Sequence, residues 1–289
     1  MSAAEAGARS ARFGRLDDLR AIPVLPAVAA VFTVLVLIMA IFGAWLAPQD
    51  PNNQNLLLVG MGPSQGHLLG TDALGRDIFS RLIVGARSAV FGALIVALGA
   101  MLIGNALGLL AGYHGGWRDS LVMRVVDVVY ALPALIVAIV VVGVLGGSYA
   151  LTLGVLVFLF APNDTRIVRA AVLEQRALPY VEAARTAGAS STRIMWRHIW
   201  PNLALLVLAQ TFLTFALALV AMSSLSYLGL GVPPGTADWG RMLAEGQETL
   251  FENPAAAIAP GVLIVATAAS MTIVGDWVQE VFRADRREA

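Results

Sequence analysis

Long apolar runs constrain this chain more than any other feature of its sequence. A helix needs about 20 consecutive apolar residues to cross the roughly 30 Å hydrocarbon core of a bilayer. Four runs meet that length without a charged side chain: Val24–Leu46, Ser88–Gly112, Leu203–Leu230 and Pro254–Gly275. Two further runs are Leu121–Leu145, which carries Arg124 and Asp127, and the shorter Ser148–Asn163. Together they predict an all-α polytopic membrane protein with about six transmembrane helices.

Composition excludes several other classes of protein. Of the 289 residues, 58% are hydrophobic and 13% are charged, whereas a soluble domain has about 25% charged residues. The formal net charge is zero, so no bulk basic field would attract a nucleic acid, and we expect no such partner. Cysteine is absent, which removes disulfides, thiol nucleophiles and cysteine metal sites.

The arginines predict the orientation, because cytoplasmic loops collect positive charge. If the N-terminus is cytoplasmic, every basic residue except Arg76, Arg81, Arg87 and Arg241 falls on the cytoplasmic side. Both termini are then cytoplasmic. The predicted organisation is a cytoplasmic segment 1–23, a first span 24–46, an outer loop 47–87, a core 88–280 with a cytoplasmic loop 164–201 and an outer loop 231–253, and a cytoplasmic tail 281–289.

No residue pattern points to catalysis or to a resident cofactor. The chain lacks a phosphate-binding P-loop and a G-x-S-x-G nucleophile elbow. Its histidines, His67, His114 and His198, lie too far apart in the sequence for a zinc motif. The predicted spans hold almost no ionisable group, which argues against a proton- or sodium-coupled transporter. We therefore expect no catalytic residue, no metal site and no cofactor in this chain.

The long cytoplasmic loop has the pattern of two short helices joined by a sharp turn. Good helix formers precede Gly188, which predicts a helix end there. Ser190 or Ser191 can cap a second short helix, Thr192–Ile199, and Pro201 then opens the fifth span.

The first of these two helices carries small residues beside charged ones. Ala183 and Ala184 would let another surface approach closely, while Glu182 and the arginines remain at the rim. The alternative is an amphipathic hairpin that touches only lipid headgroups. The residues by themselves leave both interpretations open.

Charged residues and glycines also gather just before the second span. Turn residues with Asx-type caps lead there into a helix predicted from Ile78. Their side chains either satisfy backbone groups and one another at the outer mouth, or form a gate or a docking rim for a binding protein. The residues of this mouth are Asp72, Gly75, Arg76, Asp77 and Arg81.

The second outer loop, 231–253, is acidic and contains one short helical pattern. Thr236 can cap this helix. The predicted role is a helix lying on lipid, with contact to a binding protein as the alternative. Its membrane-facing residues would be Trp239, Met242, Leu243 and Leu250.

Within the spans, Gly104, Gly108 and Gly112 recur every four residues, which predicts close helix packing. Asn105 and Gln210 are uncharged polar residues, suited to hydrogen bonds between helices or to the lining of a solvated route. Kinks are predicted at two prolines, Pro133 and Pro260.

Three separated motifs resemble one family. Glu182-Ala183-Ala184, with Gly188, His198 and Pro201-Asn202, resembles the cytoplasmic EAA loop of permease subunits in ABC importers. The other two resemble signatures of the dipeptide/oligopeptide branch of these importers. They are His67–Asp72 with Gly75-Arg76-Asp77 and Ser80–Arg87, and Leu225–Gly231 with Trp239-Gly240 and Glu245-Gly246.

The resemblance is to the second, C-type permease of that branch, and it extends from the first span nearly to the C-terminus. Departures occur at Ala161–Arg166, where the family usually has an aromatic residue before the proline and a tyrosine after it, and at Trp200, where it usually has leucine. They leave the details of docking open.

The resemblance implies a type I ABC importer permease fold in the bacterial inner membrane. This chain would form half of a peptide pathway with a sister permease as a heterodimer, and an extracytoplasmic binding protein would deliver the peptide. Two ATPase subunits would bind ATP and Mg and dock on the loop as a coupling helix. The implied coupling residues are Glu182, Ala183, Ala184, Gly188, Arg193, His198 and Pro201.

Two alternatives to this interpretation stay open. The same class of importer can carry another cargo, namely nickel, an opine or glutathione. Less favoured is a membrane-embedded enzyme or scaffold centred on Asp72, Arg76 and Asp77, since that cluster lacks a paired nucleophile and base.

Overall fold

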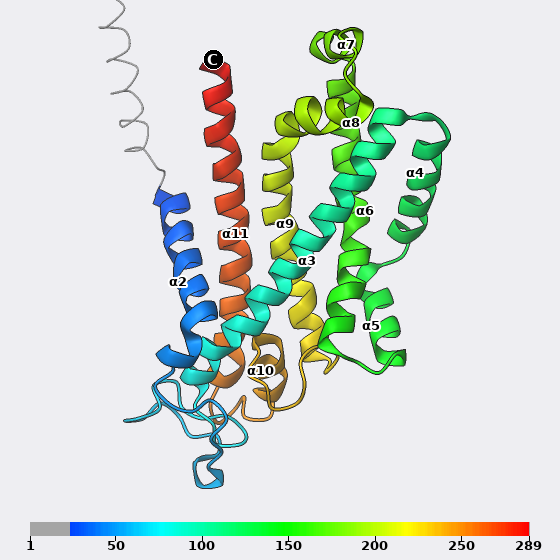
Figure 1. Cartoon of the computed structure of the whole chain (residues 1–289). Coiled ribbons are helices and arrows are strands. Elements are labelled where there is room, and N and C mark those ends of the chain that lie inside the picture. The colour runs from blue at the N-terminus through cyan, green and yellow to red at the C-terminus, as the bar shows by residue number, and fades with distance from the viewer. Residues whose placement is uncertain (1–23, 289) are drawn as a thin grey trace, which may run out of the picture.

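A computed structural model describes residues 24–288, and the predicted segment 1–23 lies outside the described residues, as does residue 289. Long helices run side by side as a bundle (Figure 1), and residues 24–288 contain no β-strand. The elements are α2 (Val24–Leu46), η2 (Leu56–Leu58), α3 (Ile78–His114), α4 (Gly116–Tyr130), α5 (Ala134–Val144), α6 (Tyr149–Arg176), α7 (Pro179–Thr186), α8 (Ser191–Arg193), the π-helical η3 (Ile194–Ile199), α9 (Trp200–Tyr227), α10 (Trp239–Glu245) and α11 (Ala255–Glu288).

The predicted all-α membrane class is confirmed. Five helices are long and apolar enough to cross a membrane, and the α4–α5 pair makes a sixth if it crosses as one bent span. The fold has two distinct ends (Figure 1). The start of α2, the end of α11 and the short helix α7 lie at one end, called here the α7 end. Loop 47–77 and α10 lie at the other, the α10 end.

The glycine stripe of α3 packs against α6, as predicted. A Cβ atom added to Gly104 would lie 2.5 Å from the Asp164 Cβ, and one added to Gly108 would lie 2.7 Å from the Val168 Cβ. Gly112 meets Val172 in the same way, at 2.8 Å. Only residues without a side chain allow the two helices to approach this closely.

The helix of the fourth span is much longer than predicted. It continues through Asp164 to Arg176, so helix occupies the first part of the predicted cytoplasmic loop 164–201. Asp164 is buried, and its Oδ1 accepts hydrogen bonds of 3.2 Å from Gln210 and Thr214 of α9. In the sequence this charged residue ends an apolar run. In the structure the helix continues past it, because α9 supplies hydrogen-bond donors to its carboxylate.

Ionisable side chains also form pairs between helices beyond the predicted span Ser148–Asn163. Besides Asp164, α6 carries two arginines that pair with aspartates of α4. Arg166 lies 2.7 Å from Asp127, and Arg169 lies 2.5 Å from Asp119. The predicted interhelical hydrogen bond of Gln210 is confirmed, whereas Asn105 donates to Met101 within its own helix.

The third span is broken and not merely kinked. The axes of α4 and α5 differ by 80°, and Pro133 occupies the N-cap of α5 with an extended conformation. Proline lacks the N–H of a continuing helix, and it disfavours helical geometry in the residue before it. The helix predicted from Ile78 is confirmed, because α3 begins there and includes the last part of the predicted outer loop 47–87.

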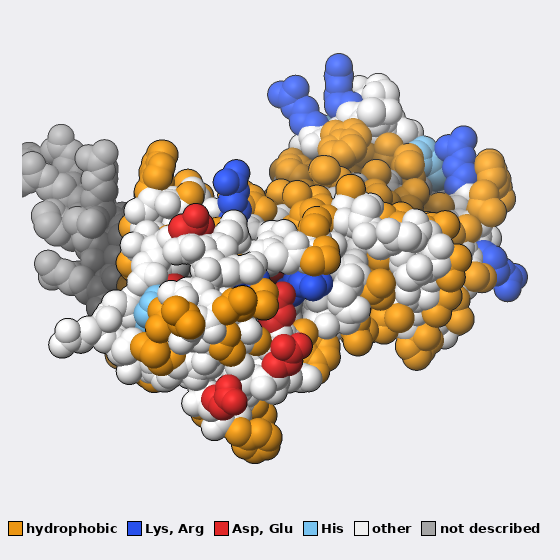
Figure 2. Space-filling model, turned by 90° about the horizontal axis from the view of Figure 1, so that it is seen from below, with side chains coloured by type: hydrophobic (Ala, Val, Ile, Leu, Met, Phe, Trp, Pro, Cys, Tyr) orange, Lys and Arg blue, Asp and Glu red, His pale blue; other side chains and the backbone are white. Residues whose placement is uncertain are grey.

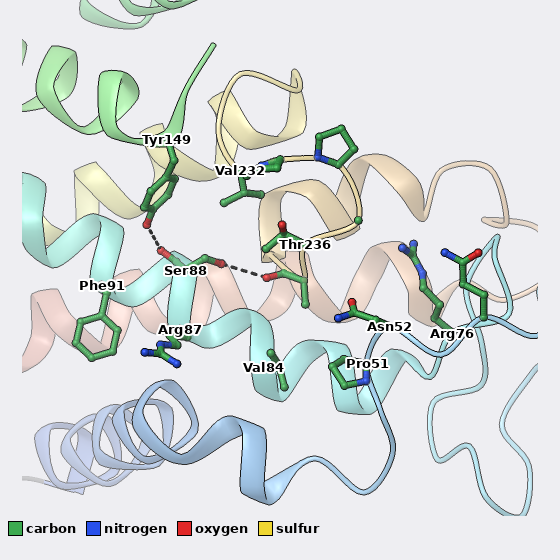
Figure 3. Close-up of a pocket in the computed structure, with 15 residues that line it drawn as sticks. Pro51, Asn52, Arg76, Val84, Arg87, Ser88, Phe91, Tyr149, Val232 and Thr236 are labelled. Atoms are coloured by element: carbon green, nitrogen blue, oxygen red, sulfur yellow. Dashed lines mark hydrogen bonds between the residues drawn. The ribbon is translucent and has the colours of Figure 1, made fainter.

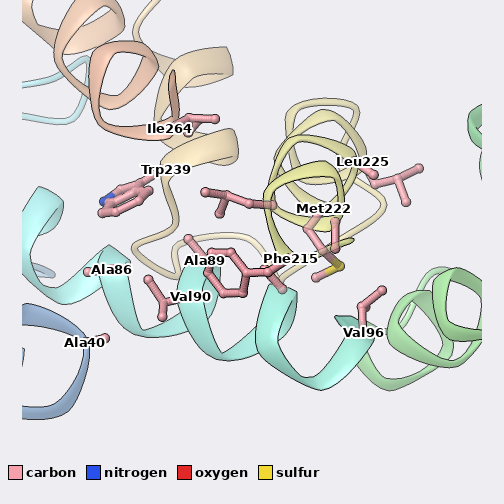
Figure 4. Packing of buried hydrophobic residues seen from close by; sticks show 14 of the residues in the cluster. Ala40, Ala86, Ala89, Val90, Val96, Phe215, Met222, Leu225, Trp239 and Ile264 are labelled. Carbon is pink, nitrogen blue, oxygen red and sulfur yellow. The ribbon is translucent and has the colours of Figure 1, made fainter. Parts of the chain in front are cut away.

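Two hydrophobic cores hold the bundle together. The larger one joins α3, α9, α10 and α11 and also receives Ala40 of α2 (Figure 4). Phe215, Met222 and Leu225 of α9 belong to this core together with Val90 of α3. The smaller core lies at the α7 end and comprises Leu109, Tyr113, Val168, Val172, Val181, Ile194, Met195, Ile199, Leu203 and Val207.

Candidate functional site

The short helix α7 projects beyond the bundle between α6 and α8 (Figure 1). Glu182, Ala183 and Arg185 are exposed on it, whereas Val181 is only 1% exposed and belongs to the smaller core. The helix is therefore anchored along one side and presents the other to the surroundings. The structure places the predicted Glu182-Ala183-Ala184 motif on this projecting helix, with Glu182 and Ala183 exposed and Ala184 half-buried.

Gly188 ends α7 with a Schellman motif. Its φ is +81°, the Ala189 N–H donates to the Ala184 carbonyl at 3.1 Å, and the Gly188 N–H donates to the Arg185 carbonyl at 3.0 Å. A Cβ at Gly188 would meet nothing within 4 Å, so the glycine is required by the backbone conformation and not by a close contact within this chain.

The predicted second short helix does not exist as a separate element. Ser190 caps it as expected, since its Oγ accepts from the Arg193 N–H at 3.4 Å. Its residues then continue through the π-helical segment η3 into α9 as one helix, Ser191–Tyr227. Pro201 lies in the first turn of α9, as predicted, although η3 runs directly into that helix. Ile194, Met195 and Ile199 of this segment are buried.

Hydrogen bonds tie α7 to both flanking helices. The Tyr180 hydroxyl of α7 donates to Gln175 Oε1 of α6 at 2.8 Å, and it accepts from Asn202 Nδ2 of α9 at 3.3 Å. The same amide donates to the His198 carbonyl at 2.7 Å. Tyr180 and Gln175 were missed by sequence reasoning, because only the fold brings them beside Asn202. Arg193 is exposed and His198 half-buried on the neighbouring turn.

At the α10 end, Asp72 organises the mouth. Its Oδ1 accepts from the backbone N–H groups of Leu74 and Arg76 at 2.9 and 3.0 Å, and its Oδ2 accepts from Arg76 Nε at 2.7 Å. Asp77 caps α3 through a 2.8 Å bond from the Ser80 N–H. Gly75 has φ +70°, and a Cβ there would collide with the Asn55 backbone.

Glu245 of α10 completes this cluster. It lies 2.6 Å from Arg76 and 3.3 Å from Arg81, whose side chains are 2% and 0% exposed. Its other oxygen accepts from Arg241 Nε at 3.1 Å. Sequence reasoning placed Glu245 in an acidic loop but did not predict these pairs. The contacts favour the structural interpretation of the mouth, because its carboxylates are occupied by arginines and backbone donors.

The expectation that α10 lies on lipid is wrong. Trp239 is 0% exposed, and its indole donates to the Leu82 carbonyl at 2.8 Å. Asp238, not Thr236, caps the helix by accepting from the N–H groups of Gly240 and Arg241. Burial raises the pKa of the Asp238 carboxyl above its usual range, partly offset by a hydrogen bond from Ser88. Trp239 and Met242 pack into the larger core, which the sequence pattern could not distinguish from a lipid surface.

The α10 end carries acidic side chains on its surface (Figure 2). Among the residues that the structure describes, no three His, Asp or Glu side chains gather as the ligands of a metal ion do.

A bundle of membrane-spanning helices with an accessible short helix between two of them defines a polytopic integral membrane protein. The chain belongs to the family of binding-protein-dependent transport system inner membrane components, whose profile matches residues 104–288. It is thus a permease of an ABC importer with the type I fold. Membership in this family implies partner ATPases and a substrate-binding protein.

Individual relatives agree with this assignment. The chain is 36% identical over 243 residues to a glutathione transport system permease protein of Pectobacterium atrosepticum, covering 84% of this chain and 81% of that protein. A putative peptide transport system permease protein of Brucella suis is also 36% identical over 243 residues, again covering 84% of this chain and 81% of that protein. With a glutathione transport system permease protein of Escherichia coli, it shares 39% identity over 247 residues, 84% of this chain and 80% of that protein.

Proposed function

We propose that this permease forms half of the translocation pathway of an ATP-driven importer for di- and oligopeptides, as the C-type subunit beside a sister permease. The α7 end faces the bacterial cytoplasm, and the α10 end faces the binding protein. The distribution of arginine supports this orientation, since Arg185, Arg193 and Arg197 lie at the α7 end. The relatives named for peptide and glutathione transport support a small peptide-like cargo.

The observation that carries this proposal is the presentation of α7. The docking core is formed by Glu182, Ala183 and Ala184, and the turn at Gly188 fixes their direction. Arg193, His198 and Pro201 flank the contact. Two ATPase subunits supply ATP and Mg binding, one of them at this loop, while this chain contributes no catalytic group.

The contacts of α7 explain how it can transmit movement. Val181 is packed in the smaller core, and Tyr180 connects to α6 and α9 through Gln175 and Asn202. A push on α7 therefore moves α6 and α9 together as a rigid body. Coupled elements of this kind convert local motion into helix tilts, and ATP binding then biases the bundle between two packings.

At the opposite end, the mouth residues Asp72, Gly75, Arg76, Asp77 and Arg81 act as a brace. Their mutual hydrogen bonds hold loop 47–77 against α3 and α10. A stiff outer surface of this kind suits a docking binding protein, because little order must be created on contact.

The experiment compares ATP hydrolysis by the reconstituted complex with and without peptide-loaded binding protein. Glu182→Lys reverses a charge on the exposed face of α7, so we expect loss of the stimulation with the complex still assembled. Glu280→Lys makes the same change on α11 at the same end and serves as the control, since Glu280 is exposed there. Normal stimulation of ATP hydrolysis and normal peptide uptake in Glu182→Lys would contradict a coupling role for α7. The helix would then be only part of an interfacial hairpin.

Cargo is tested separately, with glutathione as the second candidate because two of the relatives are named for it. Competition of radiolabelled tripeptide uptake by glutathione, nickel or an opine distinguishes the cargoes.

A further inference from the structure

A large cavity opens at the α10 end, beside the braced mouth (Figure 3). Its volume is about 880 Å³. Its walls come from α3, from the start of α6 and from the loops 51–54 and 232–237. Pockets that bind small ligands have volumes of roughly 300–1,000 Å³. The cavity is thus large enough for a short peptide.

Arg87 contributes a positively charged side chain to this cavity that is not paired with a carboxylate of the described residues. It is exposed on α3, one turn before Phe91 (Figure 3). Arg76, Arg81 and Arg241 at the same end are all paired with Glu245. Within residues 24–281, by contrast, no ion pair or hydrogen bond involves the Arg87 side chain. Its guanidinium is free to bind a carboxylate that comes from outside the chain.

Tyr149, Ser88 and Arg76 of the wall are already hydrogen-bonded, whereas the side chains of Asn52, Gln54 and Thr236 make no hydrogen bond among the described residues. The Tyr149 hydroxyl donates to the Ser88 carbonyl at 2.8 Å, and Ser88 Oγ donates to Asp238 Oδ2 at 2.8 Å. Arg76 borders the cavity but is held by Asp72 and Glu245. These bonds fix the wall and leave Arg87 as its uncommitted cation.

The remaining wall is largely apolar. Val84 and Phe91 of α3 face this space, and Val232, Pro233 and Pro234 close the side opposite α3. The cavity therefore combines one free guanidinium with apolar surface. An amino acid or peptide end has the matching combination of a carboxylate and an apolar side chain.

We propose that this cavity is a binding site for the free C-terminal carboxylate of the cargo, with Arg87 as its ion partner. The site rests on the proposed function, because peptides and glutathione both carry such a carboxylate. Arginine binds a carboxylate through two parallel N–H bonds, and this pairing gains strength where water is limited. The cargo would pause here between the binding protein and the pathway.

The absence of cysteine from the chain permits a direct test. Arg87→Cys is introduced into the complete complex in nanodiscs, and its labelling by a water-soluble maleimide is followed by mass spectrometry of this subunit. The probes are a mixture of tripeptides with free carboxylates and the same mixture as C-terminal amides. Arg118→Cys, exposed at the α7 end, is the control for nonspecific effects.

Since Arg87→Cys itself removes the ion partner, charge is restored chemically, and the complex is then reconstituted in proteoliposomes so that uptake can be measured. Treatment with an aminoethylating reagent gives residue 87 a cation, and a sulfonatoethylating reagent gives it an anion. We expect peptide uptake to fall about tenfold with Arg87→Cys and to recover only with the cationic adduct. Peptide-loaded binding protein should still slow maleimide labelling of the unmodified thiol, because the apolar part of the peptide covers it.

The amide probe separates this site from the binding protein. The wild-type and Arg87→Cys complexes receive peptides from the same binding protein. Any preference of the binding protein for free acids over amides is therefore the same for both complexes. We expect the fall in uptake to affect the free-acid peptides and to leave the residual uptake of the amides unchanged. Equal losses for acid and amide, or full uptake with the anionic adduct, overturn the proposal.

Two further outcomes would also overturn it. Shielding of the introduced thiol by empty binding protein would make the cavity a protein docking surface. Shielding in every condition would mean that the sister permease fills it. Neither result affects the test of Glu182, so failure of this site can be distinguished from failure of the proposed importer function.

Discussion

Glu245 of α10 lies 2.6 Å from Arg76, a residue 169 positions earlier in the chain. The same carboxylate reaches Arg81 and Arg241. One side chain thus joins the loop before α3, the first turn of α3 and α10 into a single unit at the α10 end. It also leaves Arg87 as the arginine of this end that makes no ion pair among the described residues.

Glu245→Ala should destabilise the protein by about 3 kcal/mol, because it leaves two buried guanidinium groups short of a partner. Thermal unfolding of the purified chain in detergent measures the change. Glu248→Ala is the matched control, since Glu248 is exposed in the neighbouring turn. Equal unfolding temperatures for the two variants would show that the cluster contributes nothing to stability.

Gly188→Ala should weaken coupling more than it weakens folding. The φ of +81° costs a residue with a Cβ about 1–2 kcal/mol, which shifts the turn and redirects α7. We expect lower affinity for the ATPase subunits, measured by co-purification at increasing dilution. Gly143→Ala is the control, because its added Cβ meets nothing within 4 Å and its φ is not in the left-handed region. Undiminished co-purification would contradict a role for the turn.

Gly108→Leu should prevent the close approach of α3 and α6. A Cβ at this position already lies 2.7 Å from the Val168 Cβ and 2.9 Å from the Thr165 carbonyl, so the helices would have to separate. We expect a loss of about 3 kcal/mol or failure to assemble, judged by gel filtration and thermal unfolding. Gly154→Leu on α6 meets open space and should be tolerated.

Asp119 and Arg169 should behave as an interacting pair. Their atoms lie 2.5 Å apart and are partly exposed, so we expect a coupling of about 1 kcal/mol. Asp119→Arg and Arg169→Asp should each destabilise the chain, and the double swap should recover part of the loss. Arg124→Asp, an exposed position on α4, controls for charge alone. Additive losses in the double variant would show that the two residues do not interact.

The amino-acid sequence was enough to predict the class of this protein. Apolar runs such as Val24–Leu46 predict membrane-spanning helices. The bilayer offers no hydrogen-bond partner, and a helix pairs its own backbone N–H and C=O groups. The packing of the glycine stripe Gly104–Gly112 and the turn at Gly188 were also predictable, since glycine acts through local geometry. The family resemblance carried by Glu182–Gly188 agrees with the family to which the chain belongs.

The role of each charged or aromatic residue near a span depended instead on the fold. Asp164 ended an apolar run in the sequence. Inside the bundle, however, Gln210 and Thr214 of another helix donate hydrogen bonds to its carboxylate. Trp239 suited a lipid surface equally well, but its indole donor reaches the Leu82 carbonyl in the core. Such partners lie tens of residues away, and local periodicity contains no information about them. Burial and pairing across helices are therefore properties of the packed bundle, and no single segment of the sequence encodes them.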